Sequence, residues 1–139
     1  MRNRSMMSGA EFQCGREYLG LPVQWVADSL EVDRRTVYRW ERGTFVIPQS
    51  AADMMSEWLY RTSLAVGKVT VEVLRHKDTP LLATSDEFDF MAAEGFPASW
   101  QRMLCSRVAE RTGRGIVWMP LEDASSAIVS MAVNEAAKL

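Results

Sequence analysis

The segment from residue 33 to residue 43, DRRTVYRWERG, constrains the fold most because it holds the start, the apolar face and the end of one helix. Asp33 stands where an N-cap carboxylate accepts the backbone N–H three residues on, and Gly43 stands where a left-handed residue ends a helix. Val37 and Trp40 lie three positions apart and share one face. The segment therefore predicts a short amphipathic helix that buries these two side chains.

The other side of this helix carries a concentration of cations. Arg34, Arg35, Tyr38 and Arg39 fall away from the apolar face. Such a surface suits the major groove of DNA, where arginine forms paired hydrogen bonds with guanine O6 and N7. The alternative is an ordinary amphipathic helix with a solvated basic face.

Two further helices are expected before this one. Pro22 suits the first turn of a helix, because its missing N–H has no helical partner there. The small side chain of Ala27 allows a following helix to approach closely, as a helix-turn-helix requires. Ser8 and Glu11 form the sequence pattern of a capping box that opens the first helix.

The spacing of these residues resembles that of the Xre/Cro-type helix-turn-helix repressors over about residues 8–62. The matching positions are Leu19-Gly20-Leu21, Val26-Ala27, Leu30, Val32, Thr36-Val37, Trp40-Glu41 and Gly43. The resemblance implies that the second helix of the motif is the recognition helix, whose first residues contact base edges. It assigns base reading to Arg34, Arg35, Tyr38 and Arg39. It also implies that Arg16 and Glu41 form a structural salt bridge.

The chain departs from that family where phosphate contacts are usual. Pro22 and Val23 replace polar residues, and the loop after Gly43 is apolar. Backbone phosphates are therefore assigned to main-chain N–H groups and to Gln24, Thr36, Arg42, Thr44 or an amino-terminal arm with Arg2 and Arg4. The apolar loop 44–47 is expected to pack against the second half of the chain. Trp40 is assigned to the core, against Leu19 and Val26.

Charge and cysteine content restrict the function classes. The 139-residue chain has a formal net charge of −2, which argues against bulk non-specific binding of nucleic acid. Residues 33–42 nevertheless hold four arginines against two acids.

Cys14 and Cys105 show no CxxC spacing, so both are expected to be buried thiols. No stretch approaches 18 apolar residues and no signal-peptide pattern is present, so a soluble cytoplasmic protein without a membrane partner is expected.

The second half of the chain changes character. In chain order the patterns first predict a helix over 49–63, a strand over 68–75, a turn over 76–80 and a short helix over 85–95. They then predict a helix over 97–113, a strand over 116–119 and a last helix from 123, for which a frayed end is the alternative. Trp100, Leu104 and Val108 form the apolar face of the longer helix. The predicted fold is mainly α with a small α+β part: a helix-turn-helix DNA-binding domain over 8–64 and a strand–helix–strand dimerisation domain over 66–139.

Two strands alone make a marginal sheet, so pairing with a second copy is expected. The strands proposed for this pairing are Val69–Leu74 and Ile116–Met119. The layout is similar to YdiL-like regulators and to the repressors associated with anti-CRISPR proteins. That resemblance implies a carboxy-terminal part that dimerises and a protein that represses its own operon.

No enzymatic activity is expected. His76 is the only histidine and lies in a polar turn, and neither a metal-ligand spacing nor a cofactor motif accompanies it. We therefore expect no catalytic residue, no bound metal and no cofactor. Three function classes remain: a dimeric repressor of a phage or mobile-element operon that binds a double-stranded operator, an antitoxin-type protein whose second half binds a toxin, and an RNA-binding regulator.

Overall fold

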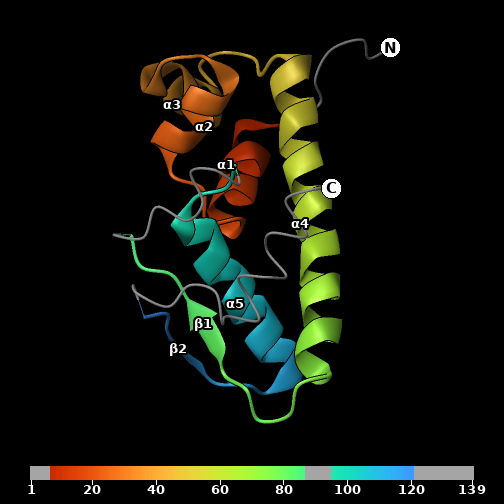
Figure 1. Ribbon diagram of the computed structural model, residues 1–139. Coiled ribbons are helices and arrows are strands. Elements are labelled where there is room, and N and C mark those ends of the chain that lie inside the picture. The colour runs from red at the N-terminus through yellow and green to blue at the C-terminus, as the bar shows by residue number, and fades with distance from the viewer. Residues whose placement is uncertain (1–6, 87–94, 121–139) are drawn as a thin grey trace. The chain divides into compact units, whose positions relative to one another are not determined.

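The computed structural model describes residues 7–86 and 95–120 (Figure 1). In chain order the elements are α1 (Gly9–Tyr18), α2 (Val23–Leu30), α3 (Arg34–Glu41), α4 (Gln49–Leu74), β1 (Leu81–Ala83), α5 (Ala98–Thr112) and β2 (Ile116–Trp118). The fold is mainly α with a small α+β second part, as the sequence predicted, and its two strands pair in parallel. The chain forms two compact units, residues 1–60 and 61–139, and their boundary falls inside α4.

The start of α1 is the predicted capping box. Ser8 Oγ accepts the backbone N–H of Glu11 at 3.0 Å, and a Glu11 carboxylate oxygen accepts the backbone N–H of Ser8 at 2.9 Å. The start of α3 differs from the prediction. Asp33 is the N-cap residue, but its side chain makes no capping hydrogen bond. The main-chain carbonyl of Asp33 accepts the N–H of Thr36 at 3.0 Å instead, so that donor does not need the carboxylate.

The first unit has an apolar core to which α1, α2, α3 and the beginning of α4 contribute. Trp40 is buried and meets the ring of Phe12 edge-on, with 5.8 Å between the ring centroids. Trp25 and Trp58 form a second aromatic pair at 5.1 Å. The predicted core position of Trp40 is confirmed. The other buried apolar residues of this unit are Leu19, Leu21, Val26, Ala27, Val37, Ile47, Ala51, Ala52 and Met55.

The strand predicted over 68–75 is wrong, because α4 continues without a break to Leu74 (Figure 1). Val66, Val69 and Val73 are buried, whereas Val71 is exposed. The buried positions follow the helical spacing i, i+3 and i+7, so one helix face contributes to the core of the second unit. Packing of that face outweighs the local preference of valine for strands. The predicted helix over 49–63 is therefore longer by eleven residues at its carboxyl end.

α4 is long enough to cross a bilayer but too polar, and the other helices within residues 7–86 and 95–120 are too short.

The small sheet and α5 form a strand–helix–strand unit. β1 pairs with β2 in parallel, with Leu81 opposite Ile116 and Ala83 opposite Trp118. Parallel strands need such a crossover connection. The predictions of the helix over 97–113 and of the strand at 116–119 are confirmed within two residues, and Gly113 ends α5 with a φ of 76°. Most of the predicted helix over 85–95, and the predicted tail helix from 123, lie outside the described residues.

A buried polar contact connects α5 with the end of β1. Gln101 is fully buried, and its Oε1 accepts hydrogen bonds from the N–H and the hydroxyl of Thr84 at 2.9 and 3.0 Å. Its Nε2 donates to the carbonyl of Leu82 at 2.9 Å. Each polar atom of this amide therefore has a partner, which offsets the cost of its burial.

Two further predictions about side-chain burial are corrected. Cys14 is exposed, whereas Cys105 is buried as predicted. Cys14 follows the buried Phe12 by two residues, a spacing that turns a helical side chain to the opposite face. In the apolar loop only Ile47 is buried. Phe45 and Val46 are 49% and 69% exposed, so the loop as a whole is not packed.

Candidate nucleic-acid interface

A three-residue turn joins α2 to α3. Glu31 takes the left-handed conformation, with φ 57° and ψ 46°, and Val32 N–H donates back to the carbonyl of Ala27 at 3.0 Å. A residue with a Cβ rarely adopts this conformation, and here the N–H groups of Glu31 and Val32, which donate to the carbonyls of Asp28 and Ala27, hold the turn. The result is a short helix-turn-helix in which α3 follows α2 almost at once.

The end of α3 is fixed by main-chain hydrogen bonds. Gly43 has a φ of 79°, and its N–H donates to the carbonyl of Trp40 at 3.1 Å. Thr44 N–H donates to the carbonyl of Arg39 at 2.9 Å. This pair of bonds is a Schellman motif, which requires a left-handed residue at the position of Gly43. The predicted helix stop is confirmed.

The two faces of α3 differ as the sequence predicts. Val37, Trp40 and Glu41 are buried. Arg34, Arg35 and Tyr38 are exposed, and Arg39 is half-buried. An eight-residue helix thus has one face for the core and one face for a partner.

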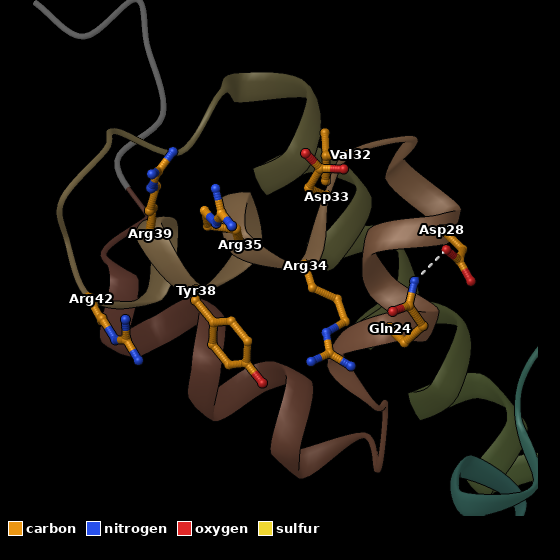
Figure 2. A pocket seen from close by; sticks show the side chains of 9 residues that line it. All are labelled: Gln24, Asp28, Val32, Asp33, Arg34, Arg35, Tyr38, Arg39 and Arg42. Atoms are coloured by element: carbon orange, nitrogen blue, oxygen red, sulfur yellow. Dashed lines mark hydrogen bonds between the residues drawn. The ribbon is translucent and has the colours of Figure 1, made fainter.

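An open groove of about 910 Å³ lies over the exposed face of α3 (Figure 2). It is lined by Gln24, Asp28, Val32, Asp33, Arg34, Arg35, Tyr38, Arg39 and Arg42. All four residues predicted to read bases are among them. Of the side chains assigned to backbone phosphates, Gln24 and Arg42 line the groove, whereas Thr36 and Thr44 do not. Arg2 and Arg4 lie outside the described residues.

Three residues of this surface, Asp28, Val32 and Asp33, were not predicted to belong to it. Asp28 follows Gln24 by four residues on α2, and this spacing places both side chains on one helix face. The spacing was thus a usable signal for Asp28. Val32 and Asp33 belong to the turn, where helical periodicity gives no direction.

The groove holds four guanidinium groups and two carboxylates. Within residues 7–86 and 95–120, no ion pair links Arg34, Arg35, Arg39 or Arg42 to an acid. Two of them lie over aromatic rings instead: Arg42 over Tyr38 at 5.5 Å, and Arg39 over Phe45 at 5.1 Å. Stacking on a ring leaves guanidinium N–H groups available to another acceptor.

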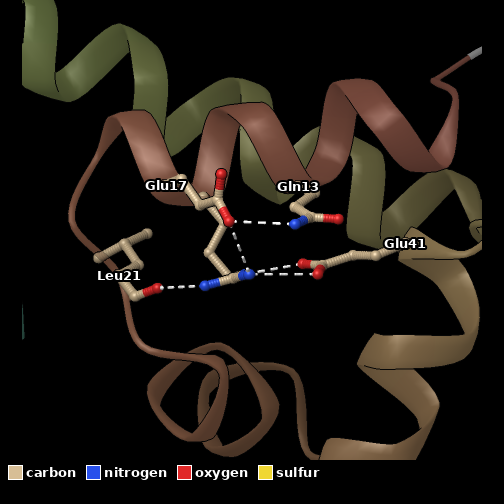
Figure 3. A network of polar contacts seen from close by, with 5 residues as sticks. Gln13, Glu17, Leu21 and Glu41 are labelled. Atoms are coloured by element: carbon tan, nitrogen blue, oxygen red, sulfur yellow. Dashed lines mark hydrogen bonds and ion pairs between the residues drawn. The ribbon is translucent and has the colours of Figure 1, made fainter.

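A largely buried ion pair ties α1 to the end of α3. Arg16 Nε donates to a Glu41 carboxylate oxygen at 2.7 Å, and Arg16 Nη2 donates to the other oxygen at 3.2 Å. Arg16 Nη1 also donates to the carbonyl of Leu21 at 3.2 Å, and Glu17 lies at 3.8 Å from Nη2. Figure 3 shows this network, in which Glu17 accepts a further bond from Gln13. The pair that the resemblance implied is present.

This arrangement can present a rigid cationic helix to an anionic partner. An α-helix with side chains is about 10–12 Å wide, close to the width of the DNA major groove of about 12 Å. The exposed guanidiniums suit both base acceptors and phosphates.

Comparison of the chain with protein-family models, with curated proteins and with solved structures finds no match. Its function is therefore inferred from the helix-turn-helix geometry and from the side chains of the groove.

Proposed function

We propose that this protein is a sequence-specific DNA-binding regulator that acts as an autoregulatory repressor of a phage or mobile-element operon. The observation that carries the proposal is the set of four guanidiniums in one open groove over α3, none of them in an ion pair with a described acid. Cations without an acidic partner, concentrated on and just after one short helix, favour an anionic partner over a purely structural role.

In the proposed complex α3 enters the major groove. Arg34 and Arg35 lie in its first turn and contact guanine, with Tyr38 and Arg39 one turn further along. Arg42 contacts a phosphate at one side of the DNA major groove, and the Gln24 Nε2–H that does not donate to Asp28 contacts a phosphate at the other side. Thr36 and Thr44 lie outside the groove lining, so their contribution to phosphate contacts is proposed to be small.

We further propose that the protein binds an inverted repeat as a homodimer, and the free edge of β2 supports this. Leu81 N–H donates to Gly115 and Met119 N–H donates to Ala83, so alternate residues of β2 face β1. The main-chain groups of Ile116 and Trp118 then point to the opposite edge, where no described strand pairs. An unprotected apolar edge favours addition of a strand from another chain.

Two alternatives have some support. An antitoxin-type protein would use the exposed side chains of Ile116, Val117 and Trp118 to bind a different protein. An RNA-binding regulator would stack bases on the exposed ring of Tyr38. Light scattering separates the first alternative from a self-sufficient dimer. Competition between duplex DNA and an RNA of the same sequence separates the second.

The direct test is selection from a random double-stranded DNA library with the full chain. We expect an inverted repeat whose half-site centres lie roughly one helical turn, or ~34 Å, apart. The same repeat is expected just upstream of the protein's own gene. The proposal fails if repeated selection enriches no sequence, or if the enriched sequence binds equally well as single-stranded RNA.

A further inference from the structure

The groove over α3 contains a carboxylate, although the proposed DNA partner is itself anionic. Asp28 is exposed on α2 and lines the same groove as the four arginines (Figure 2). A carboxylate is repelled by the phosphates of DNA, so it weakens every complex in which no donor meets it. Asp28 forms no ion pair with a cation of the described residues, although four guanidiniums line the groove.

Among the described residues, the side chain of Asp28 has one hydrogen-bond partner, a neighbouring amide. Gln24 Nε2 donates to Asp28 Oδ1 at 2.7 Å. Since a carboxylate can only accept, this bond fixes which end of the Gln24 amide faces Asp28. It leaves Asp28 Oδ2 and Gln24 Oε1 as acceptors, so the pair presents more acceptor than donor capacity to the groove.

We propose that Asp28, oriented by Gln24, is a specificity-determining residue that selects an exocyclic amine of a base. This inference rests on the proposed function and adds the chemistry of one recognised position. In the major groove the amines are N4 of cytosine and N6 of adenine. Guanine O6 and N7 and thymine O4 are acceptors, and they repel the carboxylate. Asp28 thus stabilises the complex when a base amine lies opposite it, and destabilises the complex when guanine or thymine lies there.

The chain supplies a matched control for this proposal. On α4, Gln49 Nε2 donates to Asp53 Oδ1, also at 2.7 Å and also across four residues. Asp53 is exposed and does not line the groove. Asp28→Ala and Asp53→Ala therefore remove the same charge and the same kind of hydrogen bond, but only one of them changes the groove.

The experiment uses the full chain and the duplex enriched by selection, with each position replaced in turn by the other three base pairs. We expect Asp28→Ala to reduce discrimination at one position per half-site by roughly tenfold, the effect of losing one base contact. Asp28→Asn, which has both a donor and an acceptor, should tolerate guanine or thymine at that position. Asp53→Ala should keep the wild-type pattern, and thermal melting followed by circular dichroism checks the fold of all three.

The two possible failures are distinguishable. If the wild-type chain enriches a sequence and Asp28→Ala keeps its discrimination at every position, this inference is wrong and the proposed function stands. The inference is also wrong if Asp28→Ala and Asp53→Ala raise affinity for all sequences by the same factor, because Asp28 would then act through net charge alone. If the wild-type chain enriches no sequence, the proposed function and the role of Asp28 both fail.

Discussion

Gly9, the first residue of α1, lies directly against the main-chain carbonyl of Glu41, the last residue of α3. A Cβ added to Gly9 would lie 2.3 Å from Glu41 O and 2.4 Å from Trp40 O. These neighbours are backbone atoms, so they cannot yield as a flexible side chain can. The close approach of α1 thus helps to set the position of the helix that carries the arginines.

Gly9→Ala is expected to destabilise the protein by about 1–3 kcal/mol, because the added methyl group forces α1 and α3 apart. Urea unfolding followed by circular dichroism measures the change. Gly67→Ala is the control: nothing lies within 4 Å of its added Cβ, and this site is within α4. Replacing that helical glycine should stabilise the protein by roughly 0.5–1 kcal/mol. Equal effects of the two substitutions would contradict the proposed packing role of Gly9.

Glu41→Ala is expected to cost about 3–5 kcal/mol, because it leaves the guanidinium of Arg16 buried without its carboxylate. The side chains of Arg16 and Glu41 are only 12% and 4% exposed. Glu17→Ala is the comparison, since Glu17 also lies near Arg16 but is 59% exposed. Its loss should cost no more than about 1 kcal/mol. Unfolding free energies that are alike for the two variants would show that burial does not govern this ion pair.

Arg35→Ala, and likewise Arg34→Ala, should reduce specific DNA binding by about 1–3 kcal/mol and relax the preference for one guanine per half-site. Both side chains are exposed in the groove, so the fold should be retained. Gel-shift titration with the selected duplex measures the loss. Arg75→Ala, on an exposed arginine paired with Glu72, serves as the control. Unchanged affinity in both groove variants would reject α3 as the recognition helix.

Trp118→Lys should convert the proposed dimer into a monomer, because a charged side chain on a strand edge opposes strand addition. Trp118 is 65% exposed, so the substitution should leave the monomer folded. Light scattering gives the mass of each variant, and Tyr60→Lys, at an exposed aromatic residue of α4, is the control. The dimer model with β2 at its interface is excluded if the wild-type chain is monomeric, or if Trp118→Lys stays dimeric.

The two cysteines should differ sharply in reactivity at pH 8. Cys14 is exposed, whereas burial raises the pKa of the Cys105 thiol to about 12, with Gln101 as an opposing hydrogen-bond partner. Because the thiolate is the reactive form, a thiol reagent should label Cys14 rapidly and Cys105 only after unfolding. Mass spectrometry of the labelled peptides, with and without denaturant, distinguishes the two sites. Rapid labelling of both in the native protein would show that Cys105 is not protected.

Local patterns were sufficient to predict the exposed face of α3 and its bounds, although the capping bond expected from the Asp33 side chain is not formed. The helix of Arg34–Glu41 is short, and its spacing separates Val37 and Trp40 from the arginines whatever surrounds it. The stop at Gly43 and the capping box at Ser8 are also local, since each depends on residues within one turn. The same holds for Gly113 at the end of α5.

Other features depended on contacts between distant residues. The alternation of Val69, Val71 and Val73 with polar residues is typical of a strand. The segment is helical because Val69 and Val73 pack into a shared core. The exposure of Cys14 depends on which face of α1 is turned to the core.

The residues alone predict that a basic helix closely follows a second helix, because caps, glycines and apolar spacing act over a few residues. They do not predict which side chains meet around that helix. Helical spacing places Asp28 beside Gln24 on α2, but only the packing of α1, α2 and α3 brings that face to the arginines and Gly9 to Glu41. Such contacts depend on helix crossing and close approach, which no local periodicity encodes.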